Sequence, residues 1–166
     1  MSEALIEFFS SHGIPAWGVI FIISMLPIAE LRLGLIAASI LRVPVTQAFW
    51  ICLLGNVLPL PLILLFIRTV FDWLKRRGWL VGLISWLESL AMRKSDSIKR
   101  RLFVGLFFFV AIPLPGTGGW TGALIAALLG MDVKKSMAAI ALGVLMAGLI
   151  MVTVAYLIPG FFGFTV

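Results

Sequence analysis

Two long apolar stretches, residues 45–70 and 133–158, constrain this chain more than any other feature of its sequence. Each exceeds the roughly 20 residues that a helix needs to cross the hydrocarbon core of a bilayer. Polar surface is correspondingly scarce, because 62% of the 166 residues are hydrophobic and only 12% are charged, against about 25% charged in a typical soluble domain. The sequence therefore predicts an integral membrane protein and excludes a soluble enzyme and a nucleic-acid-binding domain.

Shorter apolar runs come in pairs, one pair before each long stretch: residues 14–26 and 35–41, then 102–112 and 123–131. Each run is too short to span a membrane, and a segment containing Pro and Gly separates the two members of each pair. We therefore expect two re-entrant helical hairpins, at residues 14–41 and 102–131. The alternative, in which every run crosses and the chain has six transmembrane helices, is disfavoured by these lengths.

The two halves of the chain share the order of these parts and also share residues at an offset of 88 positions. The matched pairs are Pro27 and Pro115, Gly34 and Gly122, Ala38 and Ala126, Leu41 and Leu129, Val45 and Val133, and Gly55 and Gly143. The shared order is the stronger signal, because identities arise easily in a sequence rich in Leu and Ala. We predict one all-α membrane domain over residues 1–166, with repeats at about 14–70 and 102–158.

The placement of Lys and Arg predicts the orientation in the membrane. Eight of them lie in the linker at residues 71–101, Lys134 and Lys135 follow, and none precedes Arg32. Because basic residues favour the cytoplasmic side, we expect a multi-pass protein of the inner (plasma) membrane with a cytoplasmic linker and both termini outside. The hairpins then enter from opposite sides, as an inverted-topology repeat whose tips face each other at the midplane, where transporters of this kind bind substrate.

Two further segments are predicted to be amphipathic helices that lie in the membrane interface. They are residues 1–12, which carry two acidic side chains one helical turn apart, and residues 79–92, which basic clusters flank on both sides. Neither is long enough and apolar enough to cross the bilayer.

Glu30 and Arg32 are the sharpest candidates for function. They lie beside Pro27 in the break of the first hairpin, and an ionised side chain at the bilayer centre costs about 2.5–3.5 kcal/mol on insertion scales. In one interpretation Glu30 exchanges a proton and Arg32 binds an anionic headgroup; in the other the two form an ion pair that locks the tip. Asn56, followed by two prolines, either lines the pathway or satisfies carbonyls that the prolines free.

The break of the second hairpin is rich in Pro and Gly instead of charge. Backbone N–H groups at a helix that opens after Gly119 favour an anion, whereas the alternative interpretation is close packing through small residues. The candidate residues of this tip are Pro113, Pro115, Gly116, Thr117, Gly118, Trp120 and Thr121. No catalytic pair or metal-ligand cluster is visible in the sequence, so we expect no enzymatic activity, no cofactor and no metal site.

Three segments carry a family resemblance: residues 27–32, Gly55 with Asn56, and residues 112–123. They resemble the small multidrug export protein family, related to the DedA and VTT-domain membrane proteins, over roughly residues 14–158. The resemblance implies transport, because DedA relatives move lipid carriers such as undecaprenyl phosphate and eukaryotic relatives scramble phospholipids. The chain departs from the DedA pattern in having no charged residue between Arg101 and Asp132, where those relatives typically carry arginines.

The leading functional prediction is a transporter or flippase of an amphipathic substrate, either a lipid-linked anion or a hydrophobic drug, with proton coupling through Glu30. An energy-independent lipid scramblase and a non-transporting membrane scaffold are the alternatives. The expected partners are membrane lipid, the substrate and protons, with no nucleic acid. Because broken backbone needs cover from lipid, we also expect a homodimer or a higher homo-oligomer.

Overall fold

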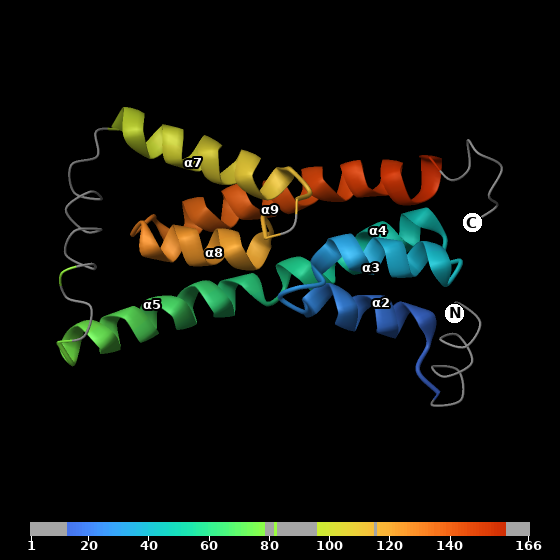
Figure 1. Ribbon diagram of the computed structural model, residues 1–166, viewed down its shortest axis with the longest axis horizontal. Coiled ribbons are helices and arrows are strands. Elements are labelled where there is room, and N and C mark those ends of the chain that lie inside the picture. The colour runs from blue at the N-terminus through green and yellow to red at the C-terminus, as the bar shows by residue number, and fades with distance from the viewer. Residues whose placement is uncertain (1–12, 79–81, 83–95, 115, 159–166) are drawn as a thin grey trace. The chain divides into compact units, whose positions relative to one another are not determined.

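The computed structural model describes residues 13–78, 82, 96–114 and 116–158, and within these ranges every regular element is a helix (Figure 1). In chain order the elements are α2 (Ala16–Met25), α3 (Glu30–Ile40), α4 (Val45–Val57), α5 (Leu60–Arg76), α7 (Asp96–Ala111), α8 (Gly119–Leu128), α9 (Val133–Val152) and the π-helix η1 (Thr153–Leu157). The two predicted interfacial helices lie outside the described residues, apart from Gly82. The all-helical prediction is therefore confirmed for the part of the chain that the structure describes.

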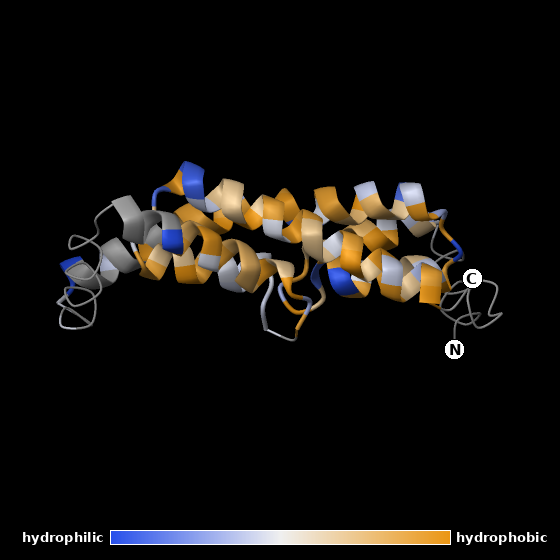
Figure 2. Ribbon diagram, turned by 90° about the horizontal axis from the view of Figure 1, so that it is seen from above, coloured by the Kyte–Doolittle hydropathy of each residue, from blue (hydrophilic) through white to orange (hydrophobic). Residues whose placement is uncertain are grey.

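Two helical stretches of the described chain are long and apolar enough to cross a membrane, Val45–Ile67 and Val133–Leu157. They coincide with the two stretches that the sequence predicts. The first is interrupted between the end of α4 at Val57 and the start of α5 at Leu60, since Pro59 has no N–H with which to continue the helix. Figure 2 shows that hydrophobic residues cover most of the length of the helices.

Three of the remaining helices are about half as long as a membrane is thick. Helices α2, α3 and α8 contain 10, 11 and 10 residues, which corresponds to about 15–17 Å at 1.5 Å per residue, against about 30 Å for the hydrocarbon core. Non-helical residues 26–29 separate α2 from α3, and residues 112–114 and 116–118 are non-helical between α7 and α8. Each predicted pair is thus interrupted by a break, but α7 contains 16 residues and is longer than the apolar run at residues 102–112 predicts.

Two helices extend into the segment that the sequence predicts as a basic linker. Helix α5 continues to Arg76 and α7 begins at Asp96, so both helices extend into the segment expected at residues 71–101. Lys and Arg are good helix formers, and a helix can continue beyond the apolar residues that suggested its end. The guanidinium of Arg77 then lies 4.7 Å from the ring centroid of Trp73, a cation–π contact at the end of α5.

The described residues form two compact units, one within Met1–Leu58 and Val144–Val166 and the other within Pro59–Gly143. The first unit contains α2, α3, α4, the second half of α9 and η1. The second contains α5, α7, α8 and the first half of α9. Each unit is thus built from one broken helix pair, the first half of one long stretch and the second half of the other.

Within the first unit the two long stretches run antiparallel. The Tyr156 hydroxyl donates a hydrogen bond to the Val43 carbonyl at 3.1 Å. A Cβ built on Gly148 would lie 2.9 Å from Cε2 of Phe49. The later residue of α9–η1, Tyr156, thus lies beside the earlier residue, Val43, and the earlier residue, Gly148, lies beside the later one, Phe49. The two helical stretches therefore run in opposite directions.

The turn after each short hairpin has the same conformation in both units. Arg42 and Gly130 both have a positive φ, at 56° and 58°. The N–H of the next residue bonds to the carbonyl of Ala38 in the first unit, at 2.9 Å, and to that of Ala126 in the second, at 3.0 Å. The matched helix ends are thus 88 positions apart, as the sequence pairs are.

Glycines let the helices of the first unit approach closely. A Cβ on Gly34 in α3 would overlap Ser24 Oγ of α2 and would lie 3.1 Å from Cys52 Sγ of α4. A Cβ on Gly55 in α4 would lie only 2.7 Å from the backbone carbonyl oxygen of Phe21. The three helices therefore pack at a distance that a larger residue at either position would prevent.

The second unit packs through the glycines that correspond to these in the sequence. A Cβ on Gly122 in α8 would lie 2.7 Å from Val110 of α7 and 3.5 Å from Ile140 of α9. A Cβ on Gly143 would lie 2.9 Å from the backbone carbonyl oxygen of Phe107. The same three contacts between helices thus occur in both units, so the resemblance of the two halves extends to how their helices pack.

Candidate functional site

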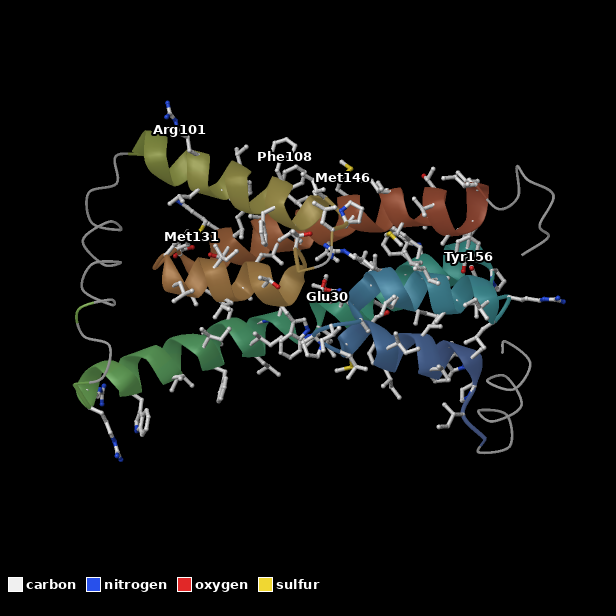
Figure 3. All side chains as sticks on the ribbon, viewed as in Figure 1. Glu30, Arg101, Phe108, Met131, Met146 and Tyr156 are labelled. Carbon is white, nitrogen blue, oxygen red and sulfur yellow. The ribbon has the colours of Figure 1, made fainter. Side chains whose placement is uncertain are left out.

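Glu30 is the first residue of α3 and is buried, with 6% of its surface exposed (Figure 3). Its φ of 52° lies in the left-handed region, which costs a residue other than glycine roughly 1–2 kcal/mol. A carboxylate in the first turn interacts favourably with the helix dipole. The break of the first helix pair therefore holds a buried acidic side chain in a conformation that the surrounding packing must impose.

Arg32 lies in the first turn of α3, is half-buried, and interacts electrostatically with Glu30. The structure thus brings together the two charges that the sequence singles out. Pro27 is exposed in the break between α2 and α3, next to Ile28, which is 93% exposed. Glu30 and Arg32 are thus buried or half-buried, whereas Pro27 is exposed to the surroundings.

Asn56 lies near the end of α4 and is 1% exposed. Its Oδ1 is buried, and among the residues that the structure describes no donor lies within hydrogen-bonding distance of it. Most buried polar side-chain atoms in proteins have a partner. The amide oxygen of Asn56 is therefore a buried acceptor without a hydrogen-bond donor among the described residues.

Glu30 and Asn56 lie at the same level of the first unit. Helices α3 and α4 are joined by a short turn and pack side by side in opposite directions, with Gly34 facing Cys52. One helical turn from Gly34 towards the break is Glu30, and one turn from Cys52 in the same direction is Asn56. Both residues are candidates predicted from the sequence, and the contact of Gly34 with Cys52 places them on facing sides of neighbouring helices.

Ser24 is a polar residue at this site that the sequence analysis misses. It is fully buried near the end of α2, and its hydroxyl donates to the Ile20 carbonyl at 2.7 Å. The Cys52 thiol hydrogen-bonds to Ser24. The sequence offers only a weak signal for Ser24, a hydroxyl next to the last residue of an apolar helix before a break.

In the second unit, Thr117 closes the break between α7 and α8 with its side chain. Its hydroxyl lies 2.6 Å from the carbonyl oxygen of Ile112 and 2.9 Å from that of Leu114, and it accepts the N–H of Leu114 at 3.2 Å. Gly116 turns the chain with a φ of 83°. The Thr117 hydroxyl is thus engaged with the backbone of its own loop, which favours a structural role for this residue.

Helix α8 begins at Gly119, one residue before the predicted start, with Gly118 as its N-cap. Both glycines are buried. The other candidates of this tip, Trp120, Thr121 and Pro113, are half-buried. Pro115 lies outside the described residues, so its match with Pro27 is untested, and the expectation that the two tips face each other stays a prediction.

The comparisons with known proteins identify a family. The family model described as "Putative small multi-drug export protein" matches residues 30–150, which include the first tip from Glu30 onwards, Asn56 and the whole second tip. No curated protein and no solved structure matches the chain. Together with the two apolar stretches, this match supports a location in a membrane. Because the match covers well over half of its length, the chain belongs to the family of small multi-drug export proteins.

Proposed function

We propose that this protein is an ion-coupled membrane transporter that exports an amphipathic substrate. The observation that carries the proposal is the burial of Glu30 at the break between two helices that are each about half a membrane long. An ionisable residue at such a depth is expensive and by default indicates a functional site. Discontinuous helices with an ionisable group at the break are typical of the binding sites of secondary transporters.

The two helix pairs are, in this proposal, re-entrant hairpins of an inverted repeat. The lengths of α2, α3 and α8 support it. The packing of Gly34 and Gly55 in the first unit corresponds to that of Gly122 and Gly143 in the second, which also supports a repeat. The antiparallel course of the two long stretches in the first unit supports opposite crossing directions. The Lys and Arg residues near the end of α5 and the start of α7 then lie in the cytoplasm, with both termini outside the inner membrane.

Glu30 takes up and releases the coupling ion, for which a proton is the first candidate because a carboxyl group is able to hold one. In the first unit the guanidinium of Arg32 is able to hold an anionic headgroup, and in the second unit the N-terminal amides of α8 are able to hold one. The substrate is accordingly a lipid-linked anion such as undecaprenyl phosphate, or a hydrophobic drug. Motion of the repeats provides alternating access, and a homodimer covers the broken hairpins. No enzymatic step is proposed.

The test is flux in liposomes that contain the purified protein, measured with and without a pH gradient. The variant Glu30→Gln retains the size and the acceptor oxygen of the side chain but cannot exchange a proton. We expect the gradient-driven flux of this variant to fall by at least about a hundredfold, the low end of the range for general acid–base groups. Asp132→Asn is the matched control, because Asp132 is exposed and accepts the N–H of Lys135, and an Asn caps a helix equally well.

Labelled undecaprenyl phosphate and a hydrophobic drug are supplied in parallel, so that the substrate class is decided in the same experiment. If Glu30→Gln transports as fast as the parent protein, the coupling role of Glu30 is wrong. Lipid movement that is equal in both directions and independent of the gradient would identify a scramblase. Absence of flux for every substrate would indicate a scaffold.

A further inference from the structure

We propose that the tip of the first helix pair contains a binding site for a monovalent metal cation, Na⁺, formed by Asn56 Oδ1, the Glu30 carboxylate and backbone carbonyls at the end of α4. This assignment goes beyond ion coupling in general, because it names a second ion and the atoms that hold it. Binding of Na⁺ does not depend on the proposed function; only its role as a coupling ion does.

The first observation is the acceptor of Asn56. Its side chain is 99% buried, and no donor among the described residues reaches Oδ1. An amide oxygen buried in this way is a hard, neutral ligand that suits alkali and alkaline-earth cations. A cation bound there supplies the interaction that the neighbouring helices do not.

The second observation is the chemistry of the backbone that follows Asn56. Proline has no N–H, so Pro59 and Pro61 are unable to donate the helical hydrogen bonds that the carbonyls of Gly55 and Val57 would otherwise accept. These carbonyls lie at the C-terminal end of α4, where the helix dipole is negative. Carbonyls at the C-terminal ends of broken helices are the groups that coordinate Na⁺ in several transporter folds.

The third observation is the position of Glu30. It starts α3 at the level at which Asn56 ends α4, because Gly34 and Cys52 face each other one turn further along both helices. One carboxylate, one amide oxygen and two carbonyls are thereby available at one end of the α3–α4 pair. All of these groups belong to the first unit.

The charge of this set favours a monovalent ion over a divalent one. Protein sites for Ca²⁺ commonly combine several carboxylates, whereas no group of three or more His, Cys, Asp and Glu side chains occurs among the residues searched in the described chain. Arg32 already interacts with Glu30, so the carboxylate carries at most one negative charge to share. A carboxylate has four lone-pair positions, which is enough for Arg32 and a cation together.

The experiment measures the melting temperature of the purified full-length protein in detergent. Na⁺ is compared with K⁺, Li⁺ and choline at equal ionic strength. We expect a saturable rise in melting temperature with Na⁺ that choline does not produce, since a ligand that binds only the folded state stabilises it. Equal melting temperatures in Na⁺ and choline would overturn the proposal.

Four variants locate the site. Asn56→Leu removes the amide oxygen and should abolish the Na⁺-dependent rise, whereas Asn56→Asp keeps an oxygen and should preserve it. Arg32→Gln removes a competing positive charge and should lower the half-maximal Na⁺ concentration by about tenfold. Gln47→Leu is the matched control, because it makes the same kind of change at an exposed position of α4 and should leave the Na⁺ effect intact.

An undiminished rise in Asn56→Leu would refute the site, as would the loss of the rise in Asn56→Asp. The melting-temperature experiment and the flux experiment test the two proposals independently. A Na⁺-dependent rise in a protein that transports nothing supports this site and refutes the proposed function. Proton-driven flux in a protein whose melting temperature is the same in Na⁺ and in choline supports the proposed function and refutes this site.

Discussion

Replacing Gly34 by alanine tests the packing of the first tip at its tightest point. The new methyl group would overlap Ser24 Oγ and would lie 3.1 Å from Cys52 Sγ and 3.3 Å from Ser24 Cβ. The Ser24 hydroxyl is held in place by its hydrogen bond to the Ile20 carbonyl and by the close packing around it. The overlap with Oγ should therefore dominate the effect of the substitution.

Overpacking of this kind costs about 1–3 kcal/mol of the free energy of unfolding. Alanine regains about 1 kcal/mol, because it favours helix more than glycine does. The net loss for Gly34→Ala is then up to about 2 kcal/mol, or up to about 8 °C in melting temperature for a chain of this length. Ser24→Ala removes Oγ, so the alanine at position 34 should cost at least about 1 kcal/mol less in that background.

The assay is a double-mutant cycle on the melting temperature in detergent. Gly105→Ala is the control, because nothing lies within 4 Å of a Cβ at that position of α7, and it should be stabilising by up to about 1 kcal/mol. Gly122→Ala is a second control, since it belongs to the other unit and its effect should add to that of Ser24→Ala. Additive effects of Ser24→Ala and Gly34→Ala would refute the packing described here.

Two further hydrogen bonds predict measurable losses of stability. Thr117→Val removes the hydroxyl that bonds to the Ile112 carbonyl at 2.6 Å while keeping the shape of the side chain, and should lower the free energy of unfolding by about 0.5–1.5 kcal/mol; an unchanged melting temperature would contradict the role of Thr117 in closing its loop. Tyr156→Phe removes the bond to the Val43 carbonyl and should cost a similar amount. Thr153→Val is the control for Tyr156→Phe. The Thr153 hydroxyl donates to the Leu149 carbonyl one turn earlier in the same helical stretch, so this variant should keep the melting temperature of the parent protein.

Much of the helical layout follows from local sequence. The long stretches found at Val45–Ile67 and Val133–Leu157 agree with the apolar lengths, and the helix breaks occur at the predicted Pro and Gly segments. These properties depend on residues a few positions apart, so a sequence shows them directly. Helix α5 also continues beyond the apolar pattern as far as Arg76, because Lys and Arg favour helix.

The candidate site was predictable only in part. Glu30 and Arg32 stand out because charge is rare in this chain, and Asn56 because it precedes two prolines. Ser24 does not stand out, since a single hydroxyl is common in membrane helices and its own hydrogen bond to Ile20 accounts for it. Its place between α3 and α4 depends on which face of α2 meets the other two helices.

Apolar length and the position of each proline thus determine where helices of this chain begin, break and end, because these effects act within one or two helical turns. They do not determine that Glu30 lies level with Asn56, that Gly34 and Gly55 pack against α2, or that the two long stretches run antiparallel in the first unit. Those features depend on contacts between helices up to 113 positions apart in the sequence, as in the bond of Tyr156 to Val43. Such contacts form only where the side chains of separate helices fit together, and helical periodicity alone does not specify that fit.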